Sequence, residues 1–468
     1  MLIPFFCACY FREYSIATSF FTIIIISVGF GETARRVISQ PKLTMKSREP
    51  YFIVTMSWLL IVFIGSLPFL MSDMDYSIMD SWFESCASWT TTGATCINMT
   101  QMPKSLLLWK AIMNWLGGMG IIVLTTSIFP RLGIGGQKMA SAEATGPKLE
   151  KLTSRYSETA KITYMLYAGF TLIELILLIP TGMSPYCILL NTLSTISTSG
   201  IVNLTGTAYG FVLTPYIKTV FSIFSLAGSF SFISYFMLFS GKWRDALRYR
   251  EIHIYLSIIG IVSALTSISL YLHGVYSNFF GAFGNSITQI ISFASTSGFT
   301  IDEIGNWPTL CKILLLIVMI IGGCGYSTSG SLKVIRVIIF FKLIMRGIYK
   351  RIHPRSLKPV MFDGKAVSSE IASKISVHIL LYFAIVMFAS ILLSLDNMDM
   401  ETTLSAVMAA FTNCGTAFGR MTTGNFSIFS DPLKFLLSLI MVTGRLEFYA
   451  ILIMFSRTFW NSNKVSQW

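Results

Sequence analysis

Charged residues are scarce in this sequence. Asp, Glu, Lys and Arg make up 12% of its 468 residues, whereas hydrophobic residues make up 53%. A soluble domain carries about 25% charged residues, and a chain of this length would form roughly three such domains. The charges here are too few to cover them. The composition therefore excludes an ordinary cytosolic enzyme, a nucleic-acid-binding protein and a disordered scaffold, and it indicates a polytopic membrane protein.

Residues that would build a metal centre or a disulfide framework are few and scattered. The eight cysteines include no CxxC pair, and the four histidines are far apart, so neither a zinc site nor a disulfide framework is indicated. The first residues lack a basic region and a small-residue cleavage site, which argues against a cleavable signal peptide. The apolar segments contain no HExxH helix and no Ser/His dyad. We therefore expect neither an enzyme nor a cofactor.

Long apolar runs are abundant. A bilayer core of about 30 Å requires about 20 apolar residues per helix. Nine segments of the sequence meet this requirement, and two of them carry internal charges: Tyr14–Gly31, Tyr51–Ser72, Ala111–Pro130, Ile162–Thr181 with Glu174, Thr219–Gly241, Ile254–Leu272, Ile313–Leu332, Ile375–Leu395 and Phe435–Ser456 with Arg445 and Glu447. A tenth segment, Met1–Phe11, is about 16 Å long as a helix. We expect it to be the tail of a truncated span or a short half-helix.

Basic residues alternate between the loops. Loops 32–50, 131–161, 242–252 and 346–374 hold 22 Lys and Arg residues, whereas segments 73–110, 182–218, 273–312 and 396–434 hold six. The positive-inside rule places the first set in the cytoplasm. The second set carries ten acidic residues, so the outer face is predicted to attract cations.

A fourfold repeat organises the chain. A short apolar stretch, a segment rich in hydroxyl and small residues, and a second span follow each of four spans. The four segments are Thr90–Thr95, Ser197–Gly200, Ser295–Thr300 and Thr412–Thr416, and their glycines are 107, 98 and 117 residues apart. Such spacing indicates one architectural unit used four times. We predict an N-terminal segment at 1–50 and repeats at 51–130, 131–241, 242–345 and 346–468.

Each unit crosses the membrane twice, so all four copies enter in the same orientation and surround one axis along the membrane normal. Non-helical backbone at membrane depth is tolerated where it lines a cavity or is buried in protein. Glycine accepts positive φ and allows carbonyl groups to turn to one side. A ring of carbonyl oxygens can replace the hydration shell of K⁺. The alternative is four helix-breaking turns packed against neighbours.

The register of the four segments favours the pore interpretation. We expect K⁺ to bind along the following filter residues: Thr91, Thr92, Gly93, Thr198, Ser199, Gly200, Thr296, Ser297, Gly298, Asn413, Cys414 and Gly415. No other metal is expected. The predicted fold class is an all-α polytopic membrane protein with pseudo-fourfold symmetry around a central pore.

With these motifs, the sequence resembles the bacterial Trk-type potassium uptake subunits of the Trk/Ktr/HKT superfamily. The resemblance runs from about Pro4 to Trp460. The residues that carry it are Thr90–Thr95, Trp115–Ile122, Gly298–Thr300, Gly322–Cys324, Leu332–Arg336 and Gly444–Glu447. It implies four membrane–pore–membrane repeats behind a two-helix N-terminal segment. It also implies a homodimer in the bacterial cytoplasmic membrane and a cytosolic nucleotide-binding regulatory subunit of the TrkA type.

The sequence departs from the family pattern at three places. The N-terminal helix is largely absent, the second filter segment has Thr198-Ser199-Gly200, and the fourth has Asn413-Cys414-Gly415-Thr416. The last two changes bear on the preference between K⁺ and Na⁺.

A second helix break is predicted within the third repeat. The apolar pattern runs from Thr309 to Met345, about 55 Å as one helix, which is nearly twice the bilayer core. Its middle, 322–331, contains four glycines, which are poor helix formers. The resemblance implies that this loop obstructs the pore below the filter. The residues of this predicted gate are Gly322, Gly323, Gly325, Ser327, Thr328 and Gly330.

This segment has two other interpretations. A phosphate-binding loop lacks its preceding strand and its Gly-Lys-Ser/Thr ending. A kink for close helix packing is the remaining alternative. We favour the gate, and we expect deletion of 325–330 to raise the open probability.

Arg445 completes the predicted gate. An arginine at the bilayer centre costs about 2.5–3.5 kcal/mol, so it usually faces a cavity or a partner. We expect Arg445, in the middle of the last span, to project into the pore beneath the filter. The alternative is a structural pair with a carboxylate or with exposed carbonyl groups.

The sequence thus predicts potential-driven K⁺ uptake. Alternatives are a Na⁺-permeant or ion-coupled K⁺ symporter of the same fold and, in another class, an alternating-access carrier. Loop 346–374, with Arg346, Lys350, Arg351, Arg355 and Lys358, would dock a regulator or contact anionic lipid at about 1 kcal/mol per basic residue.

Overall fold

Helices dominate the structure, a computed structural model that describes residues 1–37, 49–120, 156–200, 213–355, 359–421, 425–446 and 448–460. Within these ranges the strands are one short antiparallel pair, β1 (Met361–Phe362) and β2 (Lys365–Ala366). The predicted all-α class is confirmed.

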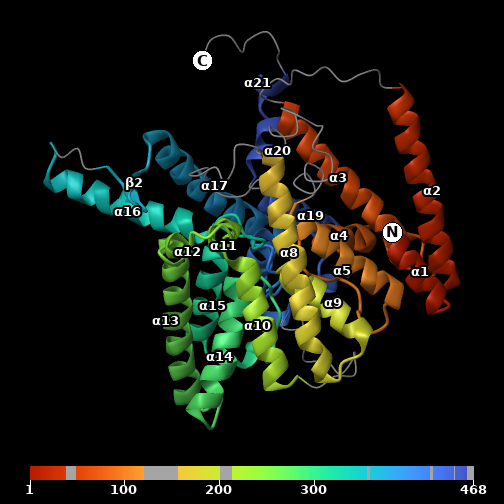
Figure 1. Ribbon diagram of the computed structural model, residues 1–468, viewed down its shortest axis with the longest axis horizontal. Helices are drawn as coiled ribbons and strands as arrows, with labels where there is room; N and C mark the ends of the chain where they lie inside the picture. Colours follow the sequence, from red (N-terminus) through yellow and green to blue (C-terminus); the bar gives the residue numbers. More distant parts are fainter. Residues whose placement is uncertain are drawn as a thin grey trace.

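Four similar units follow one another along the chain (Figure 1). Each begins with a long helix: α3 (Glu49–Leu70), α8 (Tyr156–Leu178), α13 (Arg250–Leu272) and α17 (Ser369–Leu393). A shorter helix follows: α4 (Ile78–Trp89), α9 (Pro185–Ile196), α14 (Phe279–Ala294) and α18 (Met400–Phe411). A return helix completes the described part of each unit: α5 (Lys104–Gly118), α10 (Pro215–Ser229), α15 (Thr309–Ile321) and α19 (Asp431–Arg445).

The remaining elements lie before, between and after these helices. They are α1 (Leu2–Tyr10), α2 (Tyr14–Val37), α11 (Phe232–Phe239), α12 (Trp243–Leu247), α16 (Val334–Ile352), α20 (Tyr449–Met454), α21 (Arg457–Trp460) and the 3-10 turns Ile179–Thr181, Ile304–Asn306, Ser394–Asp396, Gly419–Met421 and Phe426–Ile428. The N-terminal helices pack on the first unit, where α1 contacts α5 and α2 contacts α3. The predicted segment Met1–Phe11 contains α1, a helix of 9 residues.

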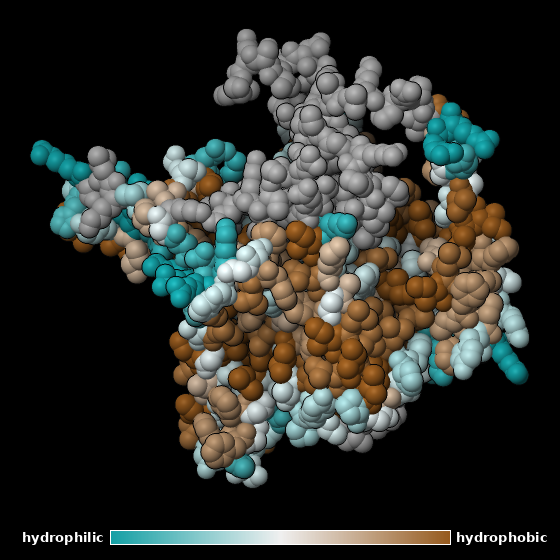
Figure 2. Space-filling model, in the orientation of Figure 1, coloured by the Kyte–Doolittle hydropathy of each residue, from teal (hydrophilic) through white to brown (hydrophobic). Residues whose placement is uncertain are grey.

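An apolar band crosses the visible face of the molecule (Figure 2). In the described part of the chain, five helices are long and apolar enough to cross a membrane, and α10 with α11 would make a sixth span if they are counted together. Figure 2 shows hydrophobic residues across the middle of the visible face, whereas hydrophilic residues gather around the projecting α16. Buried apolar residues of all four units form one continuous core. These features identify a multi-pass membrane protein.

The predicted continuous span Thr219–Gly241 is wrong. The chain bends by 91° between α10 and α11, at Phe230 and Ser231. Segment 322–333 occupies the break and replaces helical hydrogen bonds. The N–H groups of Thr328 and Cys324 donate to the carbonyl oxygens of Gly228 (3.1 Å) and Ser229 (2.9 Å), and the N–H group of Phe232 donates to the carbonyl oxygen of Tyr326 (3.1 Å).

Two further predicted spans are interrupted. Ile313–Leu332 ends as a helix at Ile321, where Gly322 has a φ of 69°, and α16 starts at Val334, so the chain has the break predicted at 322–331. Phe435–Ser456 is not continuous, because α19 ends at Arg445 and Phe448 has a φ of 44°. Half of the predicted span Ala111–Pro130, much of loop 131–161, and Glu447 lie outside the described residues.

Candidate functional site

Four short helices converge on the predicted filter. Each of them, α4, α9, α14 and α18, ends four residues before the glycine of its unit. At the opposite end, the side chains of Ser77, Ser184, Asn278 and Asp399 accept N-terminal backbone hydrogen bonds and fix where each helix begins. The C-terminus of a helix carries a partial negative charge. Four such ends therefore create a region of negative potential beside the four glycines.

The four helices end in the same way. The residue before each glycine donates its N–H group to the carbonyl oxygen five positions earlier, as Thr92 does to Ala87 (2.9 Å) and Cys414 does to Ala409 (3.0 Å). The residue two positions before each glycine has positive φ: Thr91 (57°), Thr198 (53°), Thr296 (59°) and Asn413 (57°). This is the Schellman motif, which usually has glycine or asparagine at that position. A β-branched threonine there is strained, and such strain occurs at functional sites.

The glycines join the four segments into a closed ring. A Cβ atom on Gly93 would lie 1.6 Å from the carbonyl oxygen of Ser199. The same relation links Gly200 to Ser297 (1.6 Å), Gly298 to Cys414 (1.8 Å) and Gly415 to Thr92 (2.0 Å). Each glycine thus touches the carbonyl group that precedes the next glycine. All four glycines have positive φ, between 49° and 76°, and no other residue fits these positions.

Buried side chains next to the glycines form hydrogen bonds that stabilise the ring. In the first three units, hydroxyl groups one and three residues before the glycine hydrogen-bond to each other: Thr90 with Thr92 (2.8 Å), Ser197 with Ser199 (3.1 Å) and Ser295 with Ser297 (2.9 Å). In the fourth unit, Asn413 donates from Nδ2 to Thr92 Oγ1 (3.0 Å) across the ring closure. The twelve predicted filter residues therefore lie together.

Segment 322–333 lies against three of the four filter segments. Gly330 donates its N–H group to Thr296 Oγ1 (2.9 Å), and a Cβ atom on Gly330 would lie 2.1 Å from the carbonyl oxygen of Thr412. Thr328 Oγ1 hydrogen-bonds to the carbonyl oxygen of Gly228 (2.9 Å) and lies 3.4 Å from Thr198 Oγ1.

Two buried charged residues fix this segment. Glu251 Oε1, at the start of α13, accepts hydrogen bonds from the N–H groups of Gly325 (2.7 Å) and Ile335 (3.2 Å). Lys333 donates from Nζ to Ser327 Oγ (3.3 Å) and to the carbonyl oxygen of Ser329. The predicted gate residues Gly322 and Gly323 lie at its start, where a Cβ on Gly323 would lie 2.9 Å from the carbonyl oxygen of Ser229.

Arg445 connects this segment to the first unit. Its Nη1 donates to the carbonyl oxygen of Thr328 (2.7 Å), and its Nη2 donates to the carbonyl oxygens of Gly117 (2.7 Å) and Gly118. The residue is the last of α19, so the helix that carries it does not continue through the predicted span, and its projection into a pore stays a prediction. The guanidinium group has exposed carbonyl groups as partners, because α5 and segment 322–333 both present carbonyl groups there.

Comparison with known proteins decides the family. The model of the TrkH family, described as "Cation transport protein", matches residues 16–259 and 278–466. The chain belongs to the TrkH family. It is 30% identical to the Trk system potassium uptake protein TrkH of Escherichia coli K12, over 98% of this chain and 95% of that protein. It is 28% identical to the Trk system potassium uptake protein TrkI of Halomonas elongata, over 89% of this chain and 85% of that protein.

A solved structure is also similar. The crystal structure of the potassium transporter TrkH from Vibrio parahaemolyticus superposes with a TM-score of 0.86. The two chains are 29% identical, and the match covers 98% of this chain and 96% of that chain.

Sequence reasoning missed several residues that support the site in this TrkH-family chain. Glu84 and Lys110 form a fully buried ion pair, and Gln289 contacts the third filter segment. Glu84 and Gln289 both precede the glycine of their unit by nine residues, 84 to 93 and 289 to 298. That shared offset was visible in the sequence. Glu251 lies in the first turn of the long helix of its unit, as Glu49 and Glu370 do in theirs, so the sequence marks the position but does not reveal that Glu251 is buried against segment 322–333.

Proposed function

We propose that this chain conducts K⁺ into the cell across the bacterial cytoplasmic membrane, through a filter lined by backbone carbonyl groups. The observation that carries the proposal is the closed ring in which Gly93, Gly200, Gly298 and Gly415 each contact a carbonyl group of the next unit. Such a ring offers oxygen ligands in place of the hydration shell of the ion. The names of the relatives, which are potassium uptake proteins, support the same ion.

The membrane potential supplies the driving force in this proposal. One elementary charge that crosses 100 mV gains about 2.3 kcal/mol, which corresponds to roughly fiftyfold accumulation at equilibrium. The four helix C-termini and the acidic outer segments favour entry of cations. ATP hydrolysis by this chain is not needed for uptake of this size.

In this proposal segment 322–333 is a gate. Its contacts with Thr296 and Thr412 place it against the filter segments, and Arg445 ties it to α5 and α19. Opening requires these contacts to break. A cytosolic nucleotide-binding subunit that acts through α16 and loop 346–374 would supply the necessary energy, and a second copy of the chain would form a homodimer. The proposed repeats are 51–130, 131–241, 242–345 and 346–468.

Cation flux into proteoliposomes tests the proposal. The purified chain is reconstituted, an inside-negative potential is imposed, and uptake of K⁺, Rb⁺ and Na⁺ is compared for the wild type and Gly415→Ser. We expect K⁺ and Rb⁺ uptake to exceed Na⁺ uptake. We expect Gly415→Ser to reduce this preference, because a Cβ atom there collides with Thr92.

Other outcomes have defined meanings. Equal Na⁺ and K⁺ uptake would favour a Na⁺-permeant member of the family. Uptake that requires a second ion gradient would favour a symporter. Absence of flux both in the wild type and after deletion of 325–330 would contradict the proposal.

A further inference from the structure

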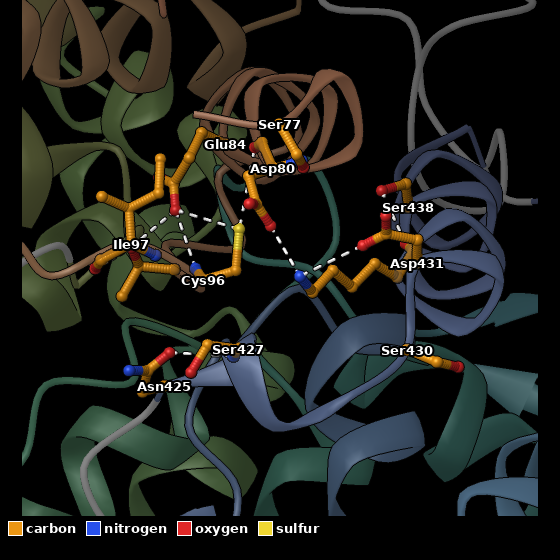
Figure 3. A network of polar contacts seen from close by, with 12 residues as sticks. Ser77, Asp80, Glu84, Cys96, Ile97, Asn425, Ser427, Ser430, Asp431 and Ser438 are labelled. Atoms are coloured by element: carbon orange, nitrogen blue, oxygen red, sulfur yellow. Dashed lines mark hydrogen bonds and ion pairs between the residues drawn. The ribbon is translucent and has the colours of Figure 1, made fainter. Parts of the chain in front are cut away.

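A buried ion pair lies directly behind the first filter segment. Glu84 on α4 and Lys110 on α5 are both fully buried and form an ion pair. Glu84 Oε1 accepts hydrogen bonds from the N–H group of Cys96 (2.8 Å) and from Thr95 Oγ1 (2.6 Å). Lys110 Nζ donates to the carbonyl oxygen of Ala94 (3.2 Å). Figure 3 shows Glu84 directed toward Cys96. The pair therefore holds the three residues that follow Gly93.

The third unit makes the same contacts with one neutral residue. Gln289 Oε1 accepts a hydrogen bond from the N–H group of Ile301 (3.2 Å), and its Nε2 donates to the carbonyl oxygen of Phe299 (3.1 Å). Ile301 lies three residues after Gly298, as Cys96 lies three residues after Gly93. Phe299 corresponds to Ala94 in the same way. Both units thus fix the first carbonyl group and the third N–H group after the filter glycine.

Elementary chemistry explains why one unit needs two residues and the other needs one. A glutamine amide offers both an acceptor oxygen and a donor nitrogen, whereas an ionised glutamate offers acceptors alone. In the first unit the donor must come from another residue, and Lys110 supplies it while neutralising Glu84. The residue that corresponds to Lys110 in the third unit is Leu315, seven positions after the equivalent proline N-cap. Leu315 is buried and makes no polar contact of this kind.

We propose that Glu84 and Lys110 are positioning residues that set the ion selectivity of the filter by fixing segment 93–96. The proposal rests on the proposed function of the filter. Units one and three are opposite each other in the ring, because Gly93 contacts unit two and Gly200 contacts unit three. The two sets of contacts therefore hold opposite walls of the same aperture. In unit four, Ser405 Oγ accepts the corresponding N–H group, that of Phe418 (2.9 Å), but it provides no donor for the carbonyl group of Thr416.

The proposal is tested by replacing the two residues of unit one with the residue types found at the corresponding positions of unit three. The variant Glu84→Gln/Lys110→Leu copies Gln289 and Leu315 and retains both an acceptor and a donor. The variant Glu84→Leu/Lys110→Leu is equally uncharged but has neither. Reconstituted variants are compared with the wild type for the ratio of K⁺ to Na⁺ uptake, after their folding is checked by gel filtration and thermal unfolding.

We expect the glutamine variant to keep the wild-type ratio within about twofold, because it restores both hydrogen bonds. We expect the leucine variant to lose at least about fivefold in the ratio, which is the effect of one net hydrogen bond. The matched control is Lys312→Leu/Glu401→Gln, which removes an ion pair (2.8 Å) that does not contact a filter segment. It should leave the ratio unchanged.

Three results separate the possible failures. A folded leucine variant with the wild-type ratio would overturn the proposal, because the filter would not need the contacts. A glutamine variant as unselective as the leucine variant would also overturn it, because the hydrogen bonds would not be the cause. A wild-type protein without preference for K⁺ would contradict the proposed function itself.

Discussion

Arg445 Nη1 donates a hydrogen bond to the carbonyl oxygen of Thr328 at 2.7 Å, across 117 residues of the sequence. The contact joins the end of the last return helix to segment 322–333, which lies against the predicted filter segments. The same guanidinium group also holds Gly117 and Gly118 at the end of α5. Arg445 therefore links three units at one point, and opening of the proposed gate must release at least the contact with Thr328.

Replacement of Arg445 by glutamine should raise the basal K⁺ flux several-fold and lower the stability of the protein. Each hydrogen bond from a charged group contributes about 1.5–3 kcal/mol, and the loss of these bonds frees segment 322–333. Flux into proteoliposomes and the melting temperature in detergent measure the two effects. Arg420→Gln, which changes an exposed arginine, is the control. A fall in flux at a normal amount of folded protein would contradict a role in closing the pore.

Two substitutions of Glu251 should distinguish a hydrogen-bonding role of this residue from an effect of its charge. Glu251→Gln keeps an oxygen that accepts from Gly325 and Ile335, so flux and stability should remain near wild type. Glu251→Ala leaves two buried N–H groups without an acceptor, which costs about 1–3 kcal/mol for each group. We expect this variant to unfold at a lower temperature and to leak K⁺. If the glutamine and alanine variants behave alike, the hydrogen bonds do not hold the segment.

Alanine at each filter glycine should abolish the preference for K⁺. The added Cβ atom would lie 2.0 Å or less from a carbonyl oxygen, so the ring must open at Gly93, Gly200, Gly298 or Gly415. The control is Gly260→Ala in α13, where no atom lies within 4 Å of the new Cβ. That change should be neutral or stabilise the helix by up to about 1 kcal/mol. The ratio of Rb⁺ to Na⁺ uptake measures the difference. A filter alanine variant with the wild-type ratio would argue against a carbonyl-lined filter.

The outer end of the fourth unit should be sensitive to acid. Hydrogen bonds from Thr402 hold the pKa of Asp399 below its ordinary value of 3.8, and Arg420 acts in the same direction. Because the pKa is lower in the folded protein, the stabilisation is present above pH 3.8 and is lost as the pH falls through the folded value. Asp399→Asn keeps the helix cap and should remove this part of the acid sensitivity. Asp399→Ala should cost about 1 kcal/mol at neutral pH. Thermal unfolding between pH 3 and pH 7 measures this effect. If the stability of the wild type and of Asp399→Asn depends on pH in the same way, Asp399 does not contribute to the acid sensitivity.

The positions of the four backbone turns at Gly93, Gly200, Gly298 and Gly415 could be predicted from the sequence because each depends on local chemistry. A glycine that follows hydroxyl residues can be recognised as a turn from its immediate neighbours. The same holds for several glycines inside an apolar segment, which predict a helix break. The bend between α10 and α11 depends instead on Thr328, which bonds to Gly228 from 100 residues away. Gly228-Ser229 is a pair of the kind found at helix kinks, but alone it does not predict a bend of 91°.

The burial of charged residues could not be predicted from the sequence either. Lys110 and Glu84 lie in segment 73–110, which the charge pattern places outside the membrane, where charges usually mark topology. Their burial follows from the re-entrant path of α4, which brings the loop back to the middle of the protein. Similarly, the end of α19 could not be predicted, because apolar residues continue after Arg445. The positive φ of Phe448 could not be predicted either, because phenylalanine rarely adopts it.

The contact that closes the filter ring also has a consequence for biosynthesis. Asn413 and Thr92 are 321 residues apart, and they join the first unit to the last. A ribosome delivers the units in order, so the first filter segment must wait in the membrane until the fourth has been inserted. During that interval its polar backbone lacks its final neighbour, which is costly in hydrocarbon. We therefore expect chains that stop before the fourth unit to be recognised as incomplete and degraded, even though three quarters of the protein are already in place.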